Sequence, residues 1–139
     1  MVAVETRNID LAIQLFLLFM LILAYWMVRT KKNMKVHAWL FLSLTVINIA
    51  SVLLIMVPAF LAESEEIVAT PFTEHSIIMW THHLIGLLAI ALSVYILARW
   101  GVDRKKAGPC GGKRIMRFAY STWSLSIILG LLLYVVESG

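Results

Sequence analysis

The sequence predicts an all-α integral membrane protein, a single domain whose four transmembrane helices form an up-down bundle. Three observations lead to this prediction. Of 139 residues, 61% are apolar and 14% are charged, which is too little polar surface for a soluble domain of this size. The apolar residues gather in four runs, each long enough to cross about 30 Å of hydrocarbon. Lysine and arginine cluster in two of the three connections between these runs.

The four helices are expected over residues 10–28, 38–62, 76–98 and 115–136. Inside lipid every backbone N–H needs an internal partner, so each apolar run is expected to be helical. The second run contains Pro58, which has no N–H to give to the carbonyl of Leu54. We therefore expect its helix to bend or to open locally at this point. The short connections favour antiparallel neighbours.

Charge in the connections predicts the orientation. All but one of the 12 lysines and arginines lie in the first and third connections or at the helix ends beside them. The second connection holds only acidic charges, from Glu63 to Glu74. The positive-inside rule then places the first and third connections in the cytoplasm, and the second connection and both termini outside the cell membrane. This clustering indicates a lipid bilayer as the partner of the chain and no nucleic acid.

Histidines near the outer end of the third helix are the strongest candidates for chemistry, because ionisable groups inside a membrane are costly and usually functional. His75, Met79 and His82 have i, i+4 and i+7 spacing, so they share a helix face. Gly86 continues this face with a notch that would admit a flat ligand or a partner helix. His83 is turned about 100° from His82. The alternative role for these histidines is a hydrogen bond to a neighbouring helix.

Depth limits which of these residues can act together. Imidazole and thioether groups are the usual ligands of haem iron and of copper. His82 lies about 10 Å below the outer end of its helix, where the second helix offers Met56. His82 and Met56 are therefore the preferred axial pair for a b-type haem. His37 lies at the cytoplasmic end of the second helix, roughly 20 Å away in depth, and cannot ligate the same iron.

Several short motifs run through the chain: Lys35-Val36-His37, Thr70-Pro71-Phe72, Thr81-His82, and the segment from Arg117 to Trp123 that leads to Gly130 and Tyr134. Together they resemble the small CtaM-type membrane proteins over about residues 30–136. The resemblance implies a four-helix membrane protein that binds haem and takes part in the maturation of haem-copper terminal oxidases. It also implies that His37 and His82 are the ligand-type histidines. The family pattern has another histidine near the outer end of the second helix, where this chain has Met56.

The leading prediction is a small membrane protein that binds b-type haem, or a metal, in respiratory electron transfer or terminal-oxidase assembly. The cofactor-binding candidates are His82, His83, Met56 and His37. Copper is the alternative cofactor, and its candidate ligands are His75, Met79 and His82. A further alternative is a cofactor-free accessory or scaffold subunit, packed against other membrane subunits of a respiratory or oxidase complex. The sequence contains no nucleophile elbow or phosphate loop, and an enzyme acting on its own is not expected.

Overall fold

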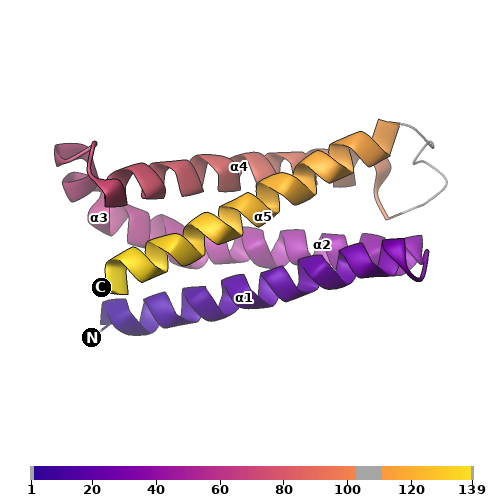
Figure 1. Ribbon diagram of the computed structural model, residues 1–139, viewed down its shortest axis with the longest axis horizontal. Helices are drawn as coiled ribbons and strands as arrows, with labels where there is room; N and C mark the ends of the chain where they lie inside the picture. The colour runs from indigo at the N-terminus through magenta and orange to yellow at the C-terminus, as the bar shows by residue number, and fades with distance from the viewer. Residues whose placement is uncertain (1, 103–110, 139) are drawn as a thin grey trace.

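Four long helical rods lie side by side in the computed structural model, which describes residues 2–102 and 111–138 (Figure 1). The elements are α1 (Val2–Arg29), α2 (Met34–Ser51), the π-helix η1 (Val52–Met56), α3 (Val57–Ala69), α4 (Glu74–Trp100) and α5 (Gly111–Ser138). Because α2, η1 and α3 follow one another without a break, they form a single rod. Every regular element in the described part of the chain is helical, which confirms the predicted all-α fold.

The four rods are membrane spans by length and composition. The candidate spans in the described residues are Arg7–Arg29, Met34–Glu65, Glu74–Trp100 and Gly112–Val136. The chain is therefore a multi-pass membrane protein, as predicted. Each helix extends beyond the predicted apolar run, because the backbone hydrogen-bond ladder continues into the polar ends of each segment. The largest differences are at the start of α1, which was expected at residue 10 and begins at Val2, and at the end of the second rod, which was expected at residue 62 and continues to Ala69.

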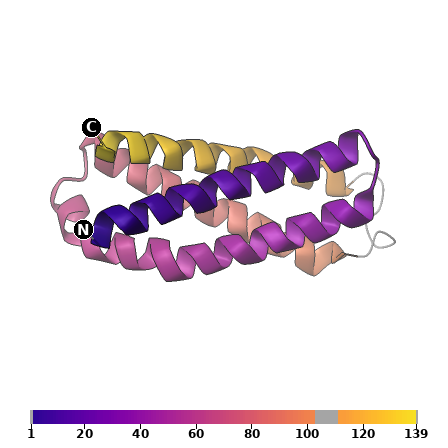
Figure 2. The ribbon, with the colours of Figure 1, turned by 90° about the horizontal axis from the view of Figure 1, so that it is seen from below.

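The two ends of the bundle carry different charges. At one end, here called the basic end, α1 and α4 finish and α2 and α5 begin, with Lys35, Arg99 and Arg114 among their residues. The opposite, acidic end holds Glu63 and Glu74. Both ends of the chain lie at the acidic end, beside the connection from α3 to α4 (Figures 1 and 2). The up-down order of the helices thus brings the termini to the same side as the second connection.

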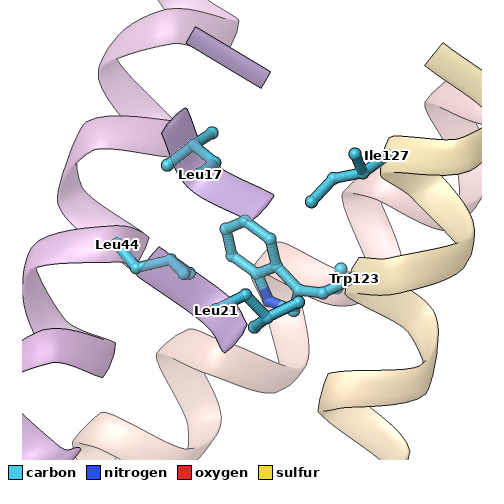
Figure 3. Packing of buried hydrophobic residues seen from close by; sticks show 6 residues of the cluster. Leu17, Leu21, Leu44, Trp123 and Ile127 are labelled. Atoms are coloured by element: carbon cyan, nitrogen blue, oxygen red, sulfur yellow. The ribbon is translucent and has the colours of Figure 1, made fainter. Parts of the chain in front are cut away.

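The core forms where two helical hairpins meet, α1 with α2 and α4 with α5. Trp123 of α5 projects toward Leu17 and Leu21 of α1 and Leu44 of α2 (Figure 3). Its indole Nε1–H donates a 2.7 Å hydrogen bond to Ser93 Oγ of α4, a side chain with no exposed surface. Lipid is as apolar as leucine, so helices in a membrane are held together by close packing and by buried hydrogen bonds of this kind.

Close approach of α4 and α5 depends on a glycine. A β-carbon at Gly86 would lie 3.1 Å from Ser126 Oγ, a contact tighter than ordinary van der Waals packing. The notch that the sequence predicts after His82 is therefore filled by the neighbouring helix. Toward the acidic end a pocket opens between the two hairpins, and the candidate functional site lies there.

Candidate functional site

A pocket of about 670 Å³ lies inside the bundle toward the acidic end. Its wall combines residues of α1, η1, α3, α4 and α5, so it lies between the two hairpins. The wall is mainly apolar and also contains imidazole, thioether, amide, carboxylate and guanidinium groups. The residues with these groups are Arg7, Asp10, Gln14, Met56, Glu63, Met79, His82 and His83. Concave, mostly apolar pockets with a few converging polar groups are the usual sites for small molecules and cofactors.

His82 is the most specifically placed of these residues. Its side chain is 5% exposed, and Nδ1 lies 2.9 Å from the backbone carbonyl oxygen of Ser126 on α5. Because a carbonyl can only accept a hydrogen bond, Nδ1 carries the proton and donates it. Nε2 of the neutral ring then keeps its lone pair. Histidines that bind metals show this arrangement, in which the second ring nitrogen donates to a carbonyl and fixes the tautomer.

Met56 reaches the same pocket from the opposite hairpin, on the π-helix η1. The wider turn is explained by Pro58, two residues after Met56. Pro58 has no N–H for the carbonyl of Leu54, and the N–H of Val57 bonds instead to the carbonyl of Val52, five residues back. The helix therefore widens near Pro58 and does not break. π-turns of this kind often occur at functional sites because they change the direction of a side chain.

His83 also lines the pocket, with a different set of contacts. Its Nδ1 lies 2.8 Å from the carbonyl oxygen of Met79, one turn earlier on the same helix. This contact holds the ring against the backbone of α4. The ring is tilted against Phe60 of α3, with the two centroids 4.9 Å apart, and stands edge-on to His82. Both histidines therefore reach one cavity, although they point in different directions along the wall.

Gln14 of α1 closes the pocket against α5. Its side chain is 6% exposed and its amide Nε2 donates a 2.6 Å hydrogen bond to Asp10 Oδ2. This bond directs the amide oxygen toward Gly130, where a β-carbon would collide with Oε1 and would lie 2.9 Å from His82 Cε1. Oε1 is buried and has no hydrogen-bond partner among the described residues. A buried acceptor beside His82 is a feature that a ligand with a donor group would satisfy.

Charged and phenolic groups stand at the acidic-end margin of the pocket. The guanidinium carbon of Arg7 lies 5.4 Å from the centre of the Tyr134 ring, and the Tyr134 hydroxyl donates to Asn8 Oδ1 at 3.1 Å. Sequence reasoning did not select Arg7, Asp10 or Tyr134 as site residues. A signal was present, because Arg7, Asp10 and Gln14 follow i, i+3 and i+7 spacing and share one face of α1.

His37 lies away from this pocket, near the basic end. It is 4% exposed, and its Nδ1 lies 3.0 Å from the carbonyl oxygen of Ala24 on α1. The ring belongs to a cluster of three with Phe41 and Tyr120, whose centroids lie 6.3 Å and 6.1 Å from its own and 6.3 Å from each other. The structure thus separates His37 from His82, as the helical rise predicts. The hydrogen bond and the stacking show that His37 joins α1, α2 and α5.

Only part of the predicted copper-binding face lines the pocket. Met79 and His82 are buried and line the pocket, whereas His75 is half-buried and is not part of the wall. In the described residues, no three His, Cys, Asp or Glu side chains are close enough to hold a metal ion. The two methionine sulfurs of the wall are further candidate donors beside the imidazoles.

The pocket groups one fixed imidazole, two thioethers and a buried amide acceptor between the hairpins of a membrane bundle. Comparisons with known proteins add nothing to this description: no protein-family model, no curated protein and no solved structure matches the chain. The resemblance to CtaM-type proteins therefore stays a prediction, and the function has to be argued from the geometry of the pocket.

Proposed function

We propose that the acidic-end pocket binds a b-type haem, with His82 as an axial ligand, in a protein of respiratory electron transfer or terminal-oxidase assembly. The observation that carries this proposal is the state of His82. The ring is buried, Nδ1 is held by the Ser126 carbonyl, and the residue lines a pocket of about 670 Å³. The remaining nitrogen, Nε2, is then the ligand atom, and its orientation does not have to be created when the cofactor binds.

The rest of the wall fits a flat amphipathic cofactor. Its volume lies within the range of about 300–1,000 Å³ typical of cofactor pockets. Met56 offers a thioether from the opposite hairpin, and His83 offers a second imidazole on α4. Arg7 lies at the charged margin, where a cation can pair with carboxylate groups of a ligand. Bound haem iron supplies one-electron redox chemistry, and the apolar wall around it sets the potential.

Copper is the second candidate, and the two methionines favour it. Met56 and Met79 line the same wall as His82, and thioethers with imidazole are soft ligands suited to Cu(I). In this version Met56 replaces His75, which lies outside the wall. A cofactor-free scaffold subunit is the remaining alternative. This alternative is supported by the many large apolar side chains that the helices expose, which would face either lipid or other subunits.

The orientation belongs to the same proposal. We place the basic end in the cytoplasm, because lysines and arginines in short connections stay on that side of a membrane. The pocket then lies toward the outer leaflet. A cofactor at this depth would exchange electrons with partners at or beyond the outer surface.

An absorbance spectrum of the detergent-purified protein tests the haem proposal. We expect a Soret band in the oxidised protein and sharp α and β bands after reduction. His82→Ala should abolish these bands, and Met56→Leu should shift or weaken them. His75→Ala is the matched control, since it removes an imidazole of the same helix that is not part of the wall. Metal analysis of the same samples tests copper.

The outcomes separate the candidates. Haem bands that persist in a folded His82→Ala, His83→Ala double variant would overturn the site. Copper in the wild type that is lost in both His82→Ala and Met56→Leu would favour the second candidate. A protein with neither haem nor copper, purified together with stoichiometric membrane subunits, would favour the scaffold role. Far-UV circular dichroism of each variant shows whether the bundle is intact.

A further inference from the structure

A second concave site lies at the basic end, on the surface of the bundle between α4 and α5. It is a groove of about 410 Å³, distinct from the pocket around His82. Its wall contains residues of both helices of the second hairpin, and half of them are apolar. The lining residues are Leu92, Arg114, Ile115, Arg117, Phe118 and Ser121.

Two arginines give the groove a positive rim. Arg114 and Arg117 are three residues apart on α5, so both project from the same face, and both are exposed. Ser121 lies about one turn further along this face, and its Oγ donates to the Arg117 carbonyl at 3.0 Å. No carboxylate is among the lining residues, so the groove presents two cations above an apolar floor. The planar guanidinium groups match the geometry of a phosphate.

The depth of the rim corresponds to the headgroup region of a bilayer. Trp100 is the last residue of α4, and its ring contacts Tyr95 edge-on with centroids 6.1 Å apart. Exposed Trp26 and Trp39 mark the same end on the first hairpin. Tryptophan and tyrosine rings of this kind gather at the membrane–water interface. At this depth in a bilayer, the arginine rim would lie level with the phosphates and the floor below it level with the acyl chains.

We propose that the α4–α5 groove binds an anionic phospholipid, with its phosphate on Arg114 and Arg117 and an acyl chain against Leu92 and Phe118. Phe118 is 55% exposed, which leaves its ring available for this contact. Basic pockets between transmembrane helices recognise anionic headgroups in this way, and a neutral phospholipid gains less because its headgroup carries no net charge. The proposal does not depend on the haem site, since the two cavities share no lining residue.

Native mass spectrometry of the full chain, released from mixed phosphatidylglycerol and phosphatidylcholine vesicles, tests the proposal. We expect the wild type to retain phosphatidylglycerol in preference to phosphatidylcholine. The Arg114→Gln, Arg117→Gln double variant should lose about 30-fold in apparent phosphatidylglycerol affinity. Each interfacial charge contributes a factor of about five, and the two factors multiply. The matched control is Lys31→Gln with Lys32→Gln, which removes two charges from the α1–α2 connection at the same end.

Three results would overturn the proposal. One is an equal loss of phosphatidylglycerol in the lysine control, which would indicate the general charge of the basic end. Another is displacement of the lipid by inorganic phosphate alone, which would indicate a phosphate site without recognition of a chain. The third comes from Ser121→Phe, which fills the groove and leaves both arginines in place. Undiminished retention in this variant would show that the groove does not hold the lipid.

Discussion

Substitution of Gly130 by alanine should destabilise the bundle through one identifiable collision. Gly130 is buried on α5, and an added β-carbon would meet the amide oxygen of Gln14 on α1. The same atom would lie 2.9 Å from both Gln14 Cδ and His82 Cε1, whereas real β-carbons essentially never come closer than 3.0 Å to their neighbours. Relief requires the Gln14 side chain to move away, by turning or by withdrawal of α1, and the His82 ring to shift as well. Both responses disturb the pocket.

The magnitude follows from comparison with a second glycine of the same helix. Overpacking a tightly filled site costs about 1–3 kcal/mol, whereas alanine gains about 1 kcal/mol over glycine in helix propensity. Gly112→Ala receives the propensity gain alone, because nothing lies within 4 Å of its added β-carbon. The difference between the two variants therefore isolates the collision. We expect Gly130→Ala to be less stable than Gly112→Ala by about 1–3 kcal/mol.

The assay is unfolding of the detergent-solubilised protein by titration with sodium dodecyl sulfate, followed by circular dichroism. Gln14→Ala supplies the second arm, because it removes two of the three colliding atoms. In a double-mutant cycle we expect Gln14→Ala to recover about 1 kcal/mol of the loss caused by Gly130→Ala. Equal stability of Gly130→Ala and Gly112→Ala, or strict additivity in the cycle, would refute the packing of α1 against α5 described above.

Three further predictions concern the packing between helices. Trp123→Phe removes the indole donor to Ser93 and should lower the free energy of unfolding by about 0.6–1.7 kcal/mol, a loss that should shrink in a Ser93→Ala background. His37→Ala breaks the link to the Ala24 carbonyl and should lower the free energy of unfolding by about 1–2 kcal/mol. It should leave any haem spectrum unchanged, and loss of the Soret band in this variant would contradict the assignment of the pocket. Gly86→Ala should cost under about 1 kcal/mol, because only the Ser126 hydroxyl must turn, whereas Gly86→Leu should separate α4 from α5 and cost about 1–3 kcal/mol in the same titration.

The spans were predictable because the bilayer imposes simple rules on a sequence. The four apolar runs give the number of helices and their order, and an even number of spans brings both termini to the same end of the bundle. Helix ends were less predictable. The apolar run stops at the edge of the hydrocarbon, whereas the hydrogen-bond ladder of α3 continues to Ala69. Pro58 was recognised as a disturbance, but the sequence could not specify that the helix would respond with a π-turn.

The sequence by itself determined a membrane bundle with His82 and Met56 at similar depth, because the helical rise fixes depth along each rod. Only the tertiary structure decided which faces of different helices meet. The facing of the helices depends on side-chain packing and on single hydrogen bonds, such as His82 to the Ser126 carbonyl and His37 to the Ala24 carbonyl. It also brought Arg7, Asp10 and Gln14 to the pocket. The rotation of one helix against another is set by contacts between residues far apart in the chain, and the periodicity of a single apolar run does not record them.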